Sequence, residues 1–186
     1  VQSTKRRVGP LSVELPKDWT LIELGEVVSN VTEIDHKMPD KVKSGIPFVA
    51  VGDITSPGRL DLEDVEEVSE EAWERLSSKF NPDRNDILYT RFGTIGHAER
   101  VDFDKDFLAS YSVALIKIEE EIESEFLAQC LNWSFLQKQA EMRTRGSANK
   151  NLNLGEIPKL VVPYPSITEQ RKIATVLYTV DRAIEK

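Results

Sequence analysis

Near the C-terminus, a short apolar run, two prolines and an amphipathic helix follow one another, and this order constrains the fold more than any other feature. Residues 160–162 form the apolar run, and Pro163 and Pro165 end it, because proline cannot donate to a strand ladder. Ser166 followed by Glu169 fits a capping box, which predicts a helix that begins near this point. The predicted helix carries one apolar stripe, whose members are spaced by four and three residues: Ile173, Leu177, Val180 and Ile184. Such a stripe needs a partner surface, either on the same domain or on another helix.

Upstream of this stretch, the residue pattern predicts a β-rich centre between helices. Short apolar runs bounded by turn-forming residues predict strands at 46–51, 86–91, 95–101 and 107–118, the last with a polar break at 110–112. Apolar periodicity predicts helices at 19–28, 72–76 and 124–143, with Ser124 as the N-cap of the last. The expected fold class is therefore α+β, with a β-rich central domain, flanking helices and a protruding C-terminal helix.

The sequence suggests three parts. Residues 1–14 contain the basic cluster Lys5-Arg6-Arg7 and no apolar signal region, and we expect a mobile leader there. Residues 15–165 form the central domain, and residues 166–186 form the terminal helix. No run of about 18 apolar residues is present, which argues against a transmembrane helix. The single cysteine, Cys130, excludes an internal disulfide and fits a buried small side chain, so a cytoplasmic location is the default expectation.

The net charge of −8 argues at first against a nucleic-acid partner, but the acidic residues are unevenly distributed. Eight of them lie at 61–74 and five at 119–125, and neither run contains a basic residue. Outside these runs, 24 Lys and Arg residues stand against 19 acidic ones, which allows a basic face if the runs lie away from it. The runs themselves are typical of solvated helix faces or loops.

Basic and amide side chains gather at two places. Arg91 lies at a predicted strand end beside a glycine turn, where its guanidinium could contact phosphate or a guanine edge, or form a salt bridge with the acidic runs. After the predicted helix 124–143 comes a polar loop without a carboxylate, and its candidate DNA-contacting residues are Arg143, Arg145, Ser147, Asn149, Lys150 and Asn151. Arg143 and Arg145 also suit a purely structural role, because cations at a helix C-terminus complement the helix dipole.

The catalytic patterns in the chain are incomplete. Residues 35–37 (D-H-K) match the D-x-K arrangement of some metal-dependent nucleases, but no Pro-Asp pair precedes them to supply the second carboxylate. Residues 81–84 (N-P-D-R) depart from the N-P-P-Y motif of amino-methyltransferases, which uses an aromatic side chain to stack the flipped base. Residues 92–96 (F-G-T-I-G) lack the glycine order of a methyl-donor loop. We therefore expect no catalytic residue, metal site or nucleotide pocket, and an exposed loop around His36.

Four segments together resemble the specificity subunits of type I restriction-modification systems. They are 15–19 (L-P-K-D-W), 51–54 (V-G-D-I), 86–93 (D-I-L-Y-T-R-F-G) and the C-terminal order of N-L-N-L, a short strand, P-x-P and E-Q-R-K-I-A. They follow the order of that family and cover most of the chain. The resemblance implies one DNA target recognition domain at 15–165 and the start of a conserved spacer helix at 166–186.

The same resemblance implies a function. A chain of this kind would read one half of a bipartite target in double-stranded DNA and would not itself be an enzyme. The methyl donor, ATP and magnesium would belong to the modification (methyltransferase) and restriction subunits, which are its implied partners. The family's paired spacer helices imply a partner-binding role for the stripe Ile173, Leu177, Val180 and Ile184, and a half-length subunit would form a homodimer that reads a symmetric site. Two alternatives stay open, a metal-dependent nuclease and a protein-interaction module that does not bind DNA.

Overall fold

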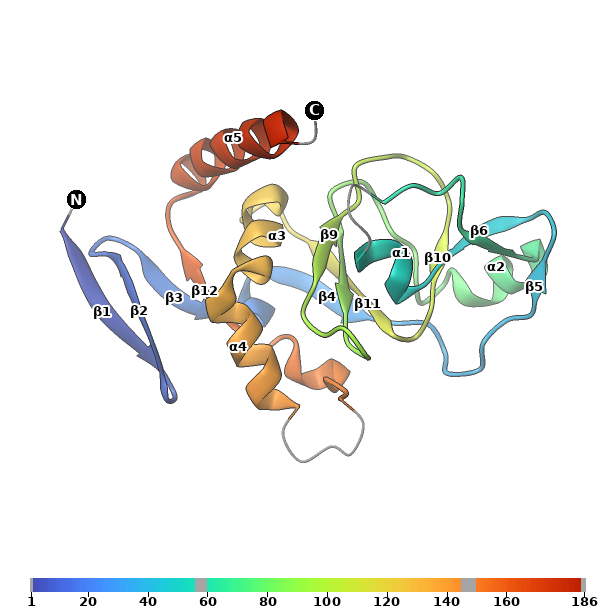
Figure 1. Cartoon of the computed structure of the whole chain (residues 1–186), viewed down its shortest axis with the longest axis horizontal. Coiled ribbons are helices and arrows are strands. Elements are labelled where there is room, and N and C mark those ends of the chain that lie inside the picture. The colour runs from blue at the N-terminus through green and yellow to red at the C-terminus, as the bar shows by residue number, and fades with distance from the viewer. Residues whose placement is uncertain (1, 56–59, 145–149, 185–186) are drawn as a thin grey trace.

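A computed structural model shows a domain of two lobes with a long helix on one side (Figure 1). The structure describes residues 2–55, 60–144 and 150–184, with side chains described up to residue 180. Helices and short strands alternate along the chain, which confirms the α+β expectation. No helix in the described part of the chain is both long and apolar enough to cross a membrane.

The N-terminal segment forms a β-hairpin, which corrects the prediction of a mobile leader at 1–14. Strands β1 (Ser3–Val8) and β2 (Leu11–Pro16) pair antiparallel around a turn at Gly9 and Pro10, where Gly9 has a φ of +55°. Alternate residues of β2 are buried, and Val13 and Leu15 belong to the first hydrophobic core. The leader prediction relied on the basic cluster in β1 and gave too little weight to the apolar alternation in β2.

A four-stranded antiparallel sheet separates the two lobes. Its order is β4 (Val28–Thr32), β11 (Val113–Ile118), β8 (Ile87–Thr90) and β9 (Ala98–Arg100), so the strands predicted at 86–91, 95–101 and 107–118 are confirmed. Side chains alternate between two cores along each central strand: Ile87 and Tyr89 face the first core, and Leu88 faces the second. Because successive strand residues point to opposite faces, this one sheet is a wall of both cores.

The second lobe is built on a smaller sheet and two short helices. The sheet order is β10 (Leu108–Ala109), β6 (Ile46–Val49), β7 (Glu66–Val68) and β5 (Lys41–Val42), with β10 parallel to β6 and the other pairs antiparallel. Helices α1 (Val51–Thr55) and α2 (Glu70–Leu76) lie in this lobe, on the right in Figure 1. The strand predicted at 46–51 and the helix predicted at 72–76 are thus confirmed.

The helix predicted at 19–28 was wrong. The structure has strand β3 (Thr20–Glu23), a short 3-10 helix η1 (Leu24–Glu26) and then β4. Strand β3 pairs antiparallel with β12 (Val161–Tyr164), which includes Val161 and Val162 of the apolar run and continues through Pro163, so Pro163 does not end the strand as predicted. A partner strand so distant in sequence provides a ladder that local periodicity does not reveal, so tertiary pairing overrides the helical pattern.

The helix predicted at 124–143 is two helices, α3 (Ser124–Asn132) and α4 (Ser134–Arg143). Trp133 between them has a φ of −71° and a ψ of 142°, an extended conformation that ends one helix and begins the next. Ser124 is the first residue of α3, and Glu123 occupies the N-cap position, which corrects the expected cap.

Helix α5 (Ile167–Ile184) lies across the N-terminal half of α3, at the top of Figure 1. The Ser166 hydroxyl accepts a hydrogen bond from the backbone N–H of Glu169 at 3.3 Å, as the capping pattern predicts. Ala174 packs with Phe126 and Cys130 of α3 in a small third core. Buried Gln170 fixes the start of the helix, because its amide accepts from the N–H of Glu123 and donates to the carbonyl of Pro165.

Candidate nucleic-acid interface

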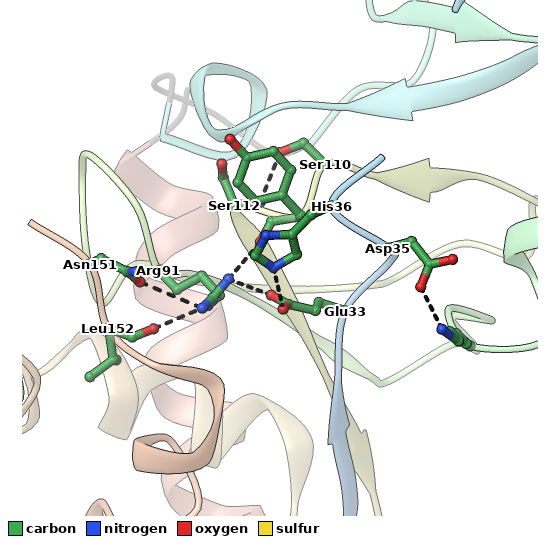
Figure 2. Close-up of polar contacts among 10 residues, drawn as sticks. Glu33, Asp35, His36, Arg91, Ser110, Ser112, Asn151 and Leu152 are labelled. Atoms are coloured by element: carbon green, nitrogen blue, oxygen red, sulfur yellow. Dashed lines mark hydrogen bonds and ion pairs between the residues drawn. The ribbon is translucent and has the colours of Figure 1, made fainter. Parts of the chain in front are cut away.

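Arg91 lies inside the protein, which corrects the expectation that it presents its guanidinium to DNA. Only 4% of the residue surface is exposed. The guanidinium donates to the carbonyls of Leu152 at 3.1 Å and Tyr111 at 3.0 Å and forms an ion pair with Glu33 (Figure 2). Burial lowers the pKa of Arg91, and the Glu33 carboxylate opposes that shift. Arg91 therefore has a structural role as a buried strut that connects these segments. Its ion-pair partner is Glu33 and not a residue of the acidic runs.

Around this strut, three aromatic side chains come together at the protein surface. The rings of His36 and Tyr111 stack with centroids 4.8 Å apart, and Phe92 meets Tyr111 edge to face at 5.4 Å. The Arg91 guanidinium lies 4.6 Å from the centre of the Phe92 ring. His36 is exposed, and Tyr111 and Phe92 are half-buried, so one face of the cluster is accessible to solvent. Sequence reasoning missed this cluster because its members follow β4, β8 and β10, and no local pattern links them.

The polar segment before β12 lies directly beside this cluster. Asn151 forms an isolated antiparallel bridge with Phe92, and the N–H of Leu152 donates to the carbonyl of Arg91 at 2.9 Å. Lys150 is exposed. Predicted DNA contacts from Lys150 and Asn151 therefore fall next to the aromatic surface and stay predictions. The other candidates from this loop, Arg145, Ser147 and Asn149, lie outside the described residues.

Arg143 has structural partners at the end of α4. Its guanidinium donates to Glu156 in η2 (Leu154–Glu156) at 2.8 Å and to the carbonyl of Lys159 at 2.7 Å. Lys159 and Arg143 together hold the pKa of Glu156 below its ordinary value by hydrogen bonding and charge. Through these two contacts, Arg143 connects the end of α4 to the segment that contains Glu156 and Lys159. This geometry does not support the expected DNA contact and fits the structural role at a helix end.

These segments form one continuous surface, which we call the recognition edge: His36, Phe92, Tyr111, Lys150 and Asn151. The end of α4 and the turn between β8 and β9 lie on the side of the molecule opposite α5 (Figure 1). The acidic run 119–125 lies on the α5 side, because Glu123 contacts both Gln170 and Arg171 of that helix. One of the two acidic runs, 119–125, therefore lies away from the recognition edge.

The stripe predicted on α5 is divided between the interior and the solvent. Ile173 is half-buried against the third core, Leu177 is half-buried, and Val180 is 49% exposed. The side chain of Ile184 lies outside the described residues. Val176, which the sequence analysis missed, is 62% exposed. The outward apolar face of α5 thus centres on Val176 and Val180, one helical turn apart.

The D-x-K segment lies in the loop after β4, where Asp35 is held in an ion pair. Asp35 pairs with Lys79 at 2.5 Å, and this lysine lowers the pKa of Asp35. Lys37 is exposed in the loop after β4, as expected for this segment. Among residues 2–55, 60–144 and 150–184, no cluster of three His, Cys, Asp or Glu side chains could hold a metal ion.

Comparison with known families identifies the class of protein. The family described as type I restriction modification DNA specificity domain matches residues 16–186, and the chain belongs to this family. It is 29% identical over 163 residues to the type I restriction enzyme EcoBI specificity subunit of Escherichia coli, which covers 86% of this chain.

Two solved structures share the fold. The HsdS subunit from Thermoanaerobacter tengcongensis aligns over 97% of this chain with a TM-score of 0.63 and 17% identity. The type I restriction-modification S subunit from M. genitalium aligns over 91% with a TM-score of 0.62 and 20% identity. The chain spans 34% of the length of the E. coli relative and 41% and 40% of the two solved chains, so it corresponds to one part of each.

Proposed function

We propose that this chain reads one half of a bipartite double-stranded DNA target for a type I restriction-modification assembly and is not itself an enzyme. The observation that carries the proposal is membership of a DNA specificity domain family over residues 16–186. The recognition edge supports it, because its polar and aromatic side chains are at least partly open to solvent and lie over the buried Arg91. The nuclease and DNA-independent alternatives have no support of this kind.

Recognition in this proposal is shared between two kinds of contact. Lys150 supplies a cation for phosphate, and the amide of Asn151 can pair with an adenine edge. His36 offers a ring edge to the groove while Tyr111 and Glu33 hold the ring in place. Since Glu33 is in turn fixed by Arg91, the orientation of His36 is set by a buried ion pair. Preorganised side chains lose little conformational freedom on binding, which favours base discrimination.

The outward face of α5 is the proposed contact with partner subunits. Val176 and Val180 are exposed apolar side chains of α5. Because α5 lies on the side of the molecule opposite the end of α4, DNA and a partner subunit could be bound at once. The partners would be the modification and, through the complex, restriction subunits, which would bring the methyl donor, ATP and magnesium. A second copy of the chain is the partner if the natural subunit has half length.

The experiment that tests the function is selection from a random duplex library by the chain assembled with its modification subunits. We expect enrichment of a motif of a few base pairs, and a gapped two-fold symmetric motif would indicate a homodimer. The variant His36→Ala should weaken the preference at one or two positions, since each lost base contact costs about 1–3 kcal/mol. The exposed Lys105, in the loop between β9 and β10, gives the control variant Lys105→Gln. An intact complex that enriches no motif would contradict the proposal.

A further inference from the structure

The N-terminal hairpin carries a charge pattern that differs from the rest of the chain. Within 3–16, three cations (Lys5, Arg6 and Arg7) stand against one carboxylate, Glu14, although the whole chain has a net charge of −8. All three cations lie on β1 and are exposed. These cations lie on a short, ordered strand of an acidic protein. A solvated tail therefore does not explain why they are concentrated there.

The strand register divides these cations between the two faces of the hairpin. Arg6 is paired with the buried Val13, so its side chain leaves the backbone on the inner face of the hairpin. Its guanidinium donates to the carbonyl of Lys17 at 3.4 Å. Lys5 and Arg7 pair with Glu14 and Ser12, which are exposed, so they share the outer face. Two residues along a strand are about 6.6 Å apart, a spacing at which two cations can contact neighbouring phosphates of one DNA strand.

The turn of the hairpin lies beside the end of α4. A surface groove there is lined by residues 8–11 of the hairpin together with Gln139, Met142 and Arg143 of α4. Arg143 in turn joins the end of α4 to η2, which leads back to Asn151. In Figure 1 the hairpin turn and the end of α4 point to the same side, away from α5. A duplex lying along the recognition edge would therefore extend toward the hairpin turn.

We propose that the hairpin is a phosphate-binding arm, in which Arg7 and Lys5 contact the DNA backbone beside the bases that the recognition edge reads. This proposal rests on the proposed function, because it requires DNA at that edge. Contacts of this kind fix the position of a protein on the duplex and carry no sequence information. Arg7 is the nearer of the two to the turn and makes the stronger contact, while Glu14 beside Lys5 weakens the second.

The test compares matched charge variants of the chain in its assembled complex on two duplexes, one with the selected motif and one scrambled. We expect Lys5→Gln/Arg7→Gln to weaken binding to both duplexes by the same factor, about fivefold to tenfold at moderate salt, and to reduce the salt slope by up to about two. Removing the opposing carboxylate in Glu14→Gln should strengthen binding to both duplexes. The control Lys105→Gln removes one exposed cation from the loop between β9 and β10, which arches over the α5 side of the molecule, and should leave affinity unchanged.

The outcomes separate this proposal from the proposed function. If the parent complex binds the motif and the hairpin variants bind with unchanged affinity and salt slope, the arm is ruled out while the recognition function stands. A change in motif preference, or loss of complex assembly, would also overturn it, because backbone contacts alter neither. If the parent complex binds neither duplex, the proposed function itself fails. Thermal unfolding of each variant confirms that the exposed substitutions leave the hairpin folded.

Discussion

At the scale of single residues, Arg91 links three segments that are far apart in the sequence. Its guanidinium bonds to Glu33 after β4, to the carbonyl of Tyr111 after β10 and to that of Leu152 before β12. Each of these segments carries a side chain of the recognition edge or adjoins one. The geometry of the surface therefore depends on a residue that itself has almost no contact with solvent.

Replacing this arginine with methionine should destabilise the protein strongly. Arg91→Met leaves the Glu33 carboxylate, which is 14% exposed, without its ion-pair partner, and we expect a loss of about 3 kcal/mol in the free energy of unfolding. Urea denaturation measures the change. The matched variant Arg91→Met/Glu33→Gln removes both charges and should regain part of the loss. Equal stability of the single variant and the parent would contradict the role of the buried pair.

At the scale of elements, side-chain amides attach helices to the edges of strands. Asn132 at the end of α3 accepts from the N–H of Ala98 in β9 at 2.9 Å and donates to its carbonyl at 2.7 Å. Gln139 in α4 does the same with Val161 of β12, both at 2.9 Å. Each amide supplies the two bonds that a neighbouring strand would make, so the helices complete the sheets as well as covering them.

The Gln139 attachment can be tested by an apolar replacement of similar size. Gln139→Leu removes both hydrogen bonds and leaves the N–H and C=O of Val161 without those partners, which should cost about 2–3 kcal/mol of unfolding free energy. The neighbouring Lys138 is exposed on the same helix, and Lys138→Ala should change stability by less than about 0.5 kcal/mol. Thermal or urea unfolding distinguishes the two, and similar values for both variants would refute the edge-completing role.

The elements were easier to predict from sequence than their connections. Local patterns were enough for β6, α2, β8 and the capped start of α5, because apolar periodicity and turn residues are local signals. The pairing of β3 with β12 depends on a partner distant in the chain, whereas the hairpin at 3–16 is a local pairing whose apolar alternation was given too little weight. The same holds for the candidate site. Lys150 and Asn151 were selected because a cation and an amide in a polar loop suit DNA contacts. The buried role of Arg91 follows from contacts with residues far away in the sequence.

At the scale of the whole molecule, the two lobes share the four-stranded sheet and are not independent. Leu115 on β11 belongs to the second core, while its neighbours Ala114 and Ile116 belong to the first. A loss of packing on one face of β11 therefore disturbs the strand that supports the other face. We infer that the two lobes unfold as one cooperative unit.

Truncating Leu115 tests this coupling. Leu115→Ala removes a fully buried side chain, and we expect a loss of about 2–5 kcal/mol in unfolding free energy. Trp73 packs on the second core and Trp19 on the first, so fluorescence of single-tryptophan versions reports on each lobe. The two transitions should shift together to the same midpoint. Two separate midpoints, with only that of Trp73 shifted, would mean that the lobes are independent.

Strand β1 is an edge strand to which no side-chain amide is attached in the described part of the chain. Strand β1 pairs only with β2 among the strands that the structure describes, so its outer edge can accept a further strand. An open edge of this kind invites pairing with a second molecule and, from there, aggregation. Lys5, Arg6 and Arg7 lie along this edge, and two copies brought edge to edge would repel each other. The cations that we assign to the DNA backbone would thus also keep the unbound protein from associating with itself.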